Sequence, residues 1–193
     1  QISFSPSLKD TLFVWDEKLV EYGQKIIHRR QKFVKEIGSL VHEVSEKLTG
    51  GREFVDIFYE SDVPADQFAD RLMESREKDL KFCSTNVGPH RDDISFYINE
   101  ISARSFGSQG QQRSVALALK LAESKVMESI TGDKPVMFLD DVMSELDENR
   151  QDYILNHLKD QQVFITRCDP NTIHQLKQGA LFKIHQGELI EQM

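Results

Sequence analysis

The sequence has few cysteines, no long apolar run and no excess of positive charge, and each absence excludes a class of protein. Two cysteines in 193 residues, Cys83 and Cys168, exclude a disulfide-rich fold and fit a reducing compartment, so we expect a cytoplasmic protein. The longest apolar run, residues 115–119, is far shorter than the roughly 20 residues that a membrane-spanning helix needs. We therefore expect no membrane association.

Acidic residues outnumber basic ones by 32 to 24, which gives a net charge of −8. Residues 1–80 contain 12 basic and 16 acidic side chains, and residues 81–193 contain the same numbers, so neither part has a basic tail. This balance excludes a globally basic DNA clamp. Local basic stripes stay compatible with DNA binding, because phosphate contacts depend on local charge.

Residues 1–80 predict a mainly helical arm subdomain. Between positions 16 and 48, apolar residues recur every seven positions from Leu19 and again from Val20, which is typical of a long helix with a broad apolar face. We expect this helix to pack against a neighbour rather than to form a free coiled coil. A strand at 54–59 and a weaker amphipathic helix after Pro64 are expected to follow.

After position 80 the pattern changes to alternating strands and helices, which predicts the α/β fold class. The alternation indicates a sheet with helical cover over 81–193. The turn residues Asn99 and Glu100 favour a hairpin between the first two strands. The expected elements are strands at 94–98, 101–104, 135–139 and 163–166, helices at 109–130 and 148–158, and a final hairpin at 181–185 and 188–190.

Two adjacent carboxylates follow an apolar strand. The four apolar residues of 136–139 predict a strand buried on both faces, and Asp140 and Asp141 come at its carboxyl end, where open α/β sheets bind ligands. Adjacent carboxylates in a partly dry site require a cation, and Mg²⁺ with a nucleotide phosphate supplies one. The alternative interpretation is that Asp141 only starts the next turn.

A glycine-containing helix start precedes this strand. Residues 107–113 are GSQGQQR, in which Ser108 and Gln111 have the spacing of a capping box. Capping alone does not explain Gly107 and Gly110, because glycine near a helix start costs stability and allows a backbone or ligand to approach closely. The segment therefore predicts an anion site. Further along, Asp147 is expected to cap the next helix.

Three segments in this order resemble the ATPase heads of the ATP-binding-cassette (ABC) group that includes SMC and Rad50, and within that group the RecF family. They are GPHRDD at 88–93, GSQGQQR at 107–113 and LDDVMSELD at 139–147. The resemblance implies the C-terminal half of an ABC-type ATPase head. Residues 81–193 would hold its signature helix and Walker B strand, and residues 1–80 would form an arm inserted in it.

The resemblance also implies a function and partners. The whole protein would be an ATP-dependent DNA-binding protein of replication and repair that forms a homodimer on ATP. It would act at gaps, where single- and double-stranded DNA meet, together with RecO and RecR. It would support recombinase loading and the SOS response.

Residue roles at the ATP sites follow from the same resemblance. Asp140 would hold Mg²⁺ through water, and Asp141 would polarise the attacking water. Ser144 and Asp147, in the segment called the D-loop, would cross the dimer interface, and Thr166 stands at the switch position. The signature residues would contact the γ-phosphate of ATP held by the opposite protomer: Ser108, Gln109, Gly110 and Gln111.

The phosphate loop of such ATPases, GxxxxGK[ST], is absent, since no glycine in this sequence is followed by lysine. The sequence also begins at Gln1 without a methionine, so we expect a piece of a longer protein whose other half holds that loop. This piece alone is expected to be inactive, whereas the full-length protein would be a slow DNA-dependent ATPase.

Four basic residues are candidate DNA contacts. Lys25, Arg29 and Lys32, the basic stripe, share one face of the long helix, although the pattern favours a solvated face over a DNA contact. Arg91 is the fourth, with an ion pair to Asp92 or Asp93 as the alternative. Two other functions stay open: a non-catalytic docking or dimerisation module for DNA or RecR, and a head fragment of an SMC- or Rad50-type protein.

Overall fold

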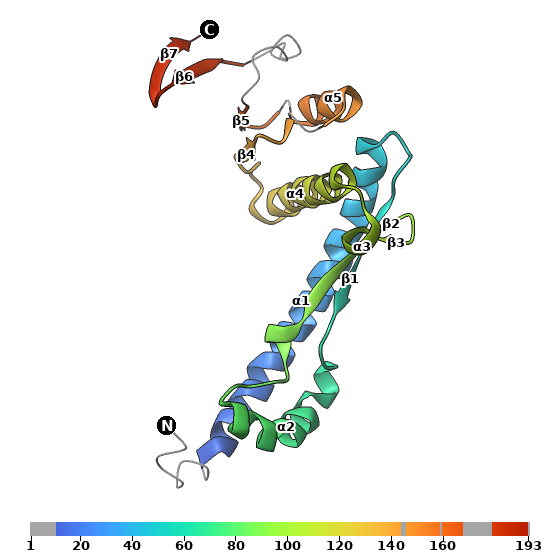
Figure 1. Cartoon of the computed structure of the whole chain (residues 1–193), viewed down its shortest axis with the longest axis vertical. Helices are drawn as coiled ribbons and strands as arrows, with labels where there is room; N and C mark the ends of the chain where they lie inside the picture. Colours follow the sequence, from blue (N-terminus) through green and yellow to red (C-terminus); the bar gives the residue numbers. More distant parts are fainter. Residues whose placement is uncertain (1–10, 144–145, 159, 168–178, 193) are drawn as a thin grey trace.

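The computed structural model describes residues 11–143, 146–158, 160–167 and 179–192, and it is elongated (Figure 1). Helix α1 (Leu12–Leu48) runs along most of its length. Helix α2 (Phe68–Phe82) lies at the end where α1 begins, and the hairpin of β6 (Phe182–His185) and β7 (Glu188–Gln192) lies at the other end. Every described helix is too short or too polar to cross a membrane.

Helix α1 confirms the predicted long helix but starts four residues earlier, at Leu12. The four apolar residues from Leu12 to Trp15 have no helical periodicity, so the pattern could not place them. At the other end, the buried Thr49 hydroxyl donates a hydrogen bond to the Ser45 carbonyl at 2.8 Å. Gly50 follows with a φ of 63°, which ends the helix as a left-handed glycine does.

An antiparallel sheet lies along α1, with the order β1 (Val55–Glu60), β2 (Asp93–Ile98) and β3 (Ile101–Ser102). The predicted turn between β2 and β3 is confirmed, because Asn99 and Glu100 both have positive φ, as the favoured hairpin turn requires. Since β1 and β2 come from opposite sides of position 80, the sheet joins the two parts of the chain. The predicted domain boundary between residues 1–80 and 81–193 stays a prediction.

The predicted strand at 101–104 is wrong in its second half, because β3 ends at Ser102 and a single helical turn, α3 (Ala103–Phe106), begins. Ala103 is buried, and its carbonyl accepts a hydrogen bond from the Gly107 N–H at 3.1 Å. This closed turn redirects the chain into the next helix. Short 3₁₀ turns at Ala65–Gln67 and Pro89–Arg91 precede α2 and β2 in the same way.

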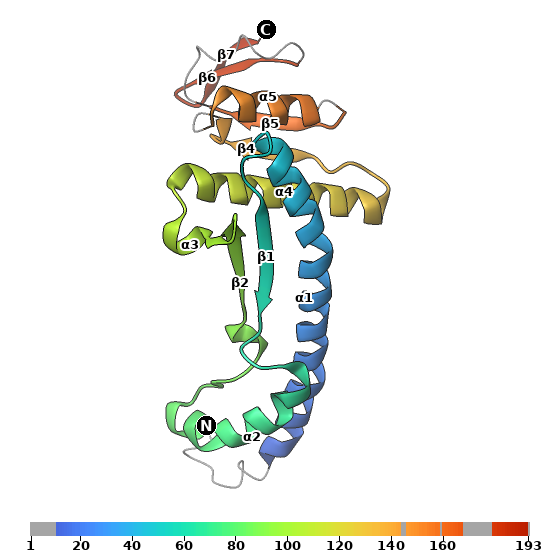
Figure 2. The ribbon, with the colours of Figure 1, turned by 90° about the vertical axis from the view of Figure 1, so that its right-hand side faces the viewer.

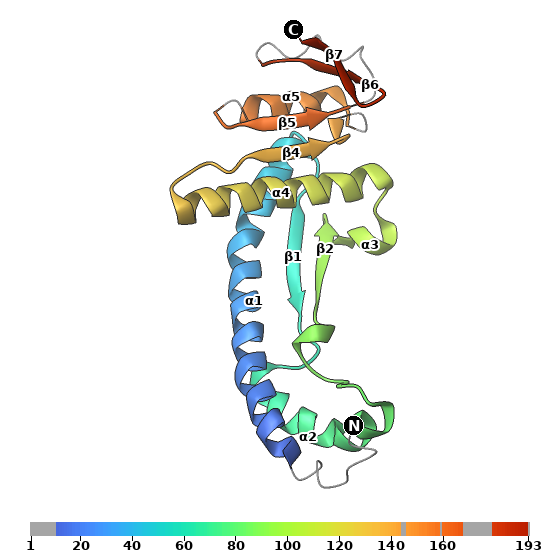
Figure 3. The same ribbon diagram turned by 90° about the vertical axis from the view of Figure 1, so that its left-hand side faces the viewer.

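The elements from α4 onward stack across the C-terminal end of α1. Helix α4 crosses α1, and a pair of parallel strands lies beyond it (Figures 2 and 3). The four elements confirm the predicted order and lie within two residues of the predicted bounds: α4 (Gln109–Thr131), β4 (Met137–Asp140), α5 (Glu148–His157) and β5 (Val163–Thr166).

One main core joins the C-terminal half of α1 to α4, α5 and the strands. Met137 and Leu139 of β4 lie in this core with Ile154 of α5. The expectation that β4 is buried on both faces is wrong, because Phe138 on its other face is 73% exposed and stacks on Phe164 of β5. A smaller cluster at the far end of α1 contains Val63, Phe68 and Leu72.

Candidate functional site

Three polar side chains meet at the carboxyl ends of the parallel strands. Asp140 ends β4, and its carboxylate accepts a short hydrogen bond from the Thr166 hydroxyl at the end of β5. The Asp141 N–H donates to both the carbonyl and the hydroxyl of Thr166, at 3.1 Å each. Asp141 has a φ of 51°, an uncommon conformation for a residue other than glycine. Thr166 therefore fixes the turn that presents both carboxylates.

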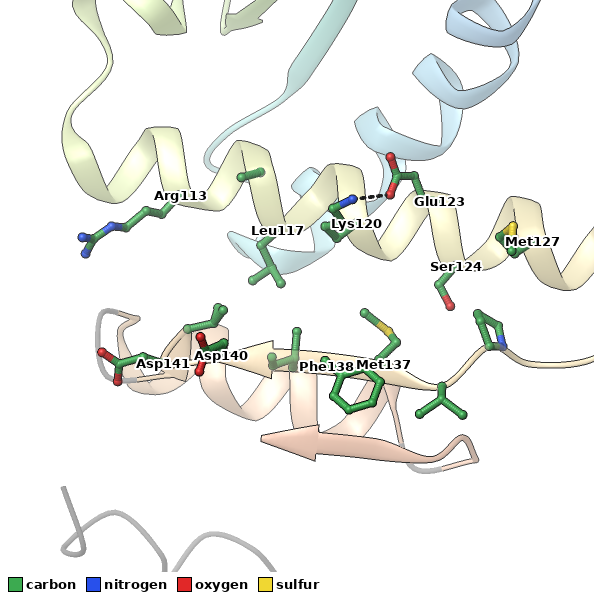
Figure 4. Close-up of a pocket in the computed structure, with 15 residues that line it drawn as sticks. Arg113, Leu117, Lys120, Glu123, Ser124, Met127, Met137, Phe138, Asp140 and Asp141 are labelled. Atoms are coloured by element: carbon green, nitrogen blue, oxygen red, sulfur yellow. Dashed lines mark hydrogen bonds and ion pairs between the residues drawn. The ribbon is translucent and has the colours of Figure 1, made fainter. Parts of the chain in front are cut away.

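These carboxylates lie at one end of a cavity of about 530 Å³ between α4 and β4 (Figure 4). Arg113 of α4 lies at the same end, and Lys120 and Glu123 of α4 form an ion pair at 2.8 Å further along. Apolar residues such as Leu117 and Met137 line its middle. The cavity thus has one polar, acidic end, of the kind that binds a cation and a polar ligand.

The start of α4 has the predicted capping box. The Ser108 hydroxyl accepts a hydrogen bond from the Gln111 N–H at 3.2 Å, and the Gln111 amide oxygen accepts from the Ser108 N–H at 2.9 Å. Ser108 and Gln109 are exposed. The capping interpretation is therefore confirmed, and it leaves the outer surface of this helix start open.

The two glycines of this segment differ in what they do. A Cβ atom at Gly107 would lie 2.5 Å from the Ala103 carbonyl oxygen, so the fold itself requires glycine there. A Cβ atom at Gly110 would have no heavy atom within 4 Å apart from its chain neighbours and the backbone of its own helical turns. Packing within this chain therefore explains Gly107 and does not explain Gly110.

The cap of α5 is connected to the start of α4 through one glutamate. Glu53, in the loop between α1 and β1, accepts hydrogen bonds from the Gln111 amide at 3.2 Å and from the Arg150 guanidinium at 2.9 Å. Arg150 also lies 3.2 Å from the carboxylate of Asp147, which accepts from the Arg150 N–H at 3.0 Å and so caps α5 as predicted. We call this set the Glu53 network: Ser108, Gln111, Glu53, Arg150 and Asp147.

The sequence could not identify the Glu53 network beforehand. Glu53 is 58 positions from Gln111 and 97 from Arg150, and no local pattern marks either contact. The predicted D-loop residue Ser144 lies outside the described residues, so only Asp147 of that pair can be located.

The GPHRDD segment at 88–93 forms a polar cluster on the arm, away from the strand ends. The buried carboxylate of Asp92 accepts hydrogen bonds from the Arg30 guanidinium at 3.2 Å, the Asp62 N–H at 2.9 Å and the Tyr59 hydroxyl. Burial, together with the Asp92 carboxylate, raises the pKa of Tyr59 to about 12. The cluster fixes β1 and β2 to α1.

Arg91 is not paired as expected. Its guanidinium lies 3.8 Å from Asp62, whereas Asp92 pairs with Arg30 and Asp93 with Arg104 at 3.2 Å. The alternative interpretation, an ion pair of Arg91 with Asp92 or Asp93, was therefore wrong, because the chain turns at Pro89–Arg91 and directs the two aspartates to other elements. The DNA contact of Arg91 stays a prediction. About half of the Arg91 side chain stays exposed.

The basic stripe is exposed on α1, with Lys25 beside Glu21 at 2.8 Å and Lys32 beside Glu36 at 3.7 Å. Exposed pairs of this kind contribute at most about 1 kcal/mol. Both lysines can therefore exchange their partners for phosphates at little cost.

The carboxylates at the strand ends fit a magnesium ion that is bound mainly by other ligands. Among the described residues no group of three or more histidines, cysteines or carboxylates could hold a metal. Mg²⁺ in nucleotide sites needs only one or two protein carboxylates, because waters and phosphates complete its coordination. Asp140 and Asp141 meet that requirement.

Comparison with known proteins identifies close relatives. No protein-family model matches the chain. It is 42% identical over 97% of its length to a DNA replication and repair protein RecF of Lachnoclostridium phytofermentans. It is 46% identical over 86% of its length to a RecF protein of Agathobacter rectalis. The chain spans about half the length of these curated relatives, 52% and 46%.

Solved structures agree with the sequence relatives. A structure of the recombination mediator protein RecF with ATP, in the RecFOR pathway, matches 95% of this chain and 52% of its own chain, with a TM-score of 0.81 and 38% identity. A structure of an SMC ATPase matches 86% of this chain with a TM-score of 0.53 and 11% identity, which shows a shared fold alone. These likenesses confirm the predicted fold class, an α/β fragment of an ATPase head.

Proposed function

Because this chain belongs to the RecF family of DNA replication and repair proteins, we propose that it supplies one part of each ATP site in an ATP-dependent, DNA-binding homodimer. The second part of each site would come from the other half of a full-length protein, since this sequence contains no GxxxxGK[ST] loop. The dimer would act in the cytoplasm at gaps in DNA, with RecO and RecR, and would support recombinase loading and the SOS response.

The observation that carries the proposal is the meeting of Asp140, Asp141 and Thr166 at the carboxyl ends of two parallel strands. Such strand ends are where open α/β sheets bind ligands. Both aspartates are exposed and lie at one end of the cavity, so a nucleotide phosphate can approach them. A solved RecF structure with ATP, similar over nearly the whole chain, supports a nucleotide as the ligand.

Each residue has a role that its position permits. Asp140 would hold Mg²⁺ through water, and the bound ion would neutralise phosphate charge during transfer. Asp141 would orient the attacking water, and Thr166 would keep both carboxylates in place through its hydroxyl. The start of α4 would face the partner protomer's nucleotide with the residues Ser108, Gln109, Gly110 and Gln111, and Ser144 and Asp147 would lie in the same interface.

The test is the substitution Asp141→Asn in the full-length protein. The amide keeps the shape of the side chain and loses the charge that orients water, so hydrolysis should fall by about 100-fold or more while ATP still binds. Since the dimer would form on ATP and separate after hydrolysis, the variant should accumulate as a dimer. Light scattering with and without ATP measures this. A monomeric variant that hydrolyses ATP at the parent rate would contradict the proposal.

A further inference from the structure

Glu53 connects the two helix starts that face the partner protomer in the proposed function. One of its carboxylate oxygens accepts from Gln111 of α4, and the other accepts from Arg150 of α5. The side chains of Glu53 and Arg150 are only 17% and 14% exposed, so their ion pair is sheltered from solvent and stronger than a surface pair. Gln111 and Arg150 in turn bind the cap residues Ser108 and Asp147.

The loop that contains Glu53 is attached to the arm. The Glu53 N–H donates to the hydroxyl of Thr49, the buried residue that ends α1, at 3.0 Å. The next N–H, of Phe54, donates to the side chain of Asn99 in the turn between β2 and β3 at 2.9 Å. Glu53 therefore has a fixed position relative to α1 and the antiparallel sheet.

We propose that Glu53 is a positioning residue, which holds Ser108 and Asp147 in register with each other and with the arm, so that both reach the partner's nucleotide together. The inference rests on the proposed function and extends it to a residue outside the signature and D-loop segments. Glu53 acts on ATP through the other members of its network, because its two oxygens are already occupied by Gln111 and Arg150.

The first experiment compares Glu53→Gln and Glu53→Ala in the full-length protein with a matched control, Glu46→Gln. Glu46 is an exposed glutamate in the last turns of α1. In a glutamine an NH2 donor replaces one of the two carboxylate oxygens, so in this geometry either Gln111 or Arg150 faces a donor in place of its acceptor. We expect kcat to fall by about 10- to 100-fold, the loss typical of misplaced catalytic groups. The Kd of a fluorescent ATP analogue should change less than about twofold, because the phosphate loop would lie in the other half. Glu46→Gln should match the parent.

The second experiment uses mixed dimers to show which side of the site Glu53 serves. If Glu53 acts through Ser108, then Glu53→Ala damages only the side that reaches across to the partner. Mixing it with Asp140→Asn should then restore about a quarter of the parent sites, since half of the dimers are mixed and each has one intact site. Mixing Glu53→Ala with Ser108→Arg should restore nothing, because both variants damage the same side.

The mixture of Ser108→Arg with Asp140→Asn separates the two levels of inference. If this mixture recovers activity and the mixture of Glu53→Ala with Asp140→Asn does not, the role of Glu53 is refuted and the proposed function stands. If this mixture fails while differently tagged subunits exchange, the trans arrangement fails and the role of Glu53 fails with it. Should Glu53→Ala melt below the parent by more than about 5 °C, Glu53→Gln replaces it in each mixture. Parent kcat in Glu53→Gln, or weakened ATP binding in step with kcat, would also refute the proposal.

Discussion

Gly110 and Gly107 lie three positions apart and should respond in opposite ways to alanine. A Cβ atom at Gly110 meets no atom within 4 Å outside its own helical turns, so Gly110→Ala should gain part of the helix propensity difference, about 0.5 kcal/mol near a helix start. A Cβ atom at Gly107 would lie 2.5 Å from a backbone carbonyl oxygen, so Gly107→Ala should lose about 1–3 kcal/mol through overpacking.

Thermal unfolding of the full-length protein measures both effects. For a protein about twice as long as this chain, 1 kcal/mol shifts the Tm by roughly 1.3 °C, so we expect the Tm to rise by about 0.5–1 °C for Gly110→Ala and to fall by about 1–4 °C for Gly107→Ala. If Gly110 is reserved for a phosphate of the partner's nucleotide, the more stable variant should nevertheless lose ATP-driven dimerisation and turnover. A Gly110→Ala protein with parent turnover would refute the close approach. A Gly107→Ala protein with parent Tm would refute the packing argument.

Three further outcomes are expected. Replacing the basic stripe with alanine should weaken DNA binding and flatten the slope of the logarithm of the DNA-binding constant against log salt, since fewer counterions are released. An unchanged slope would mean that these residues form a solvated face and do not contact DNA phosphates. Gly23→Ala should lower the Tm although alanine favours helices, because the added Cβ would overlap the ring of the buried Phe68. Gly38→Ala should lower it less, because its Cβ would lie 3.3 Å from Ile57 Cγ1, a tight contact rather than an overlap. The raised pKa of Tyr59 means that the folded state favours the neutral phenol, so the contribution of this tyrosine to stability is complete below about pH 10 and is lost as the pH rises to about 12. Denaturant unfolding across that range should show that the free energy of unfolding falls less with pH in Tyr59→Phe than in the parent.

The sequence predicted elements well where one local rule decides them. Capping and turn residues placed Ser108, Asp147 and the Asn99 turn correctly, since each acts within a few positions of itself. The parallel strand that ends in Asp140 was predicted from its apolar run, but the exposure of Phe138 was not, because burial depends on which elements cover each face.

Local sequence patterns could not predict the contacts between residues that are far apart in the chain. The pairing of Asp92 with Arg30 joins residues 62 positions apart, and nearer acids seemed equally suitable for Arg91. Likewise the sequence does not distinguish Gly107 from Gly110. The fold requires glycine at position 107 because the Ala103 carbonyl lies against it, and no such contact explains the glycine at position 110.

The length of α1 has a mechanical consequence. Its 37 residues make it about 55 Å long at the usual rise of an α-helix. The main core holds its C-terminal half, next to the loop of Glu53, while Leu12 lies at the far end. Leu12 lies 22 residues, or about 33 Å, beyond Val34, the first residue of the helix in the main core, so a rotation of about 5° at the core would move that far end by about 3 Å, the length of a hydrogen bond. Small rearrangements where α4 and α5 begin would thus become displacements at the tip large enough to make or break contacts with another molecule.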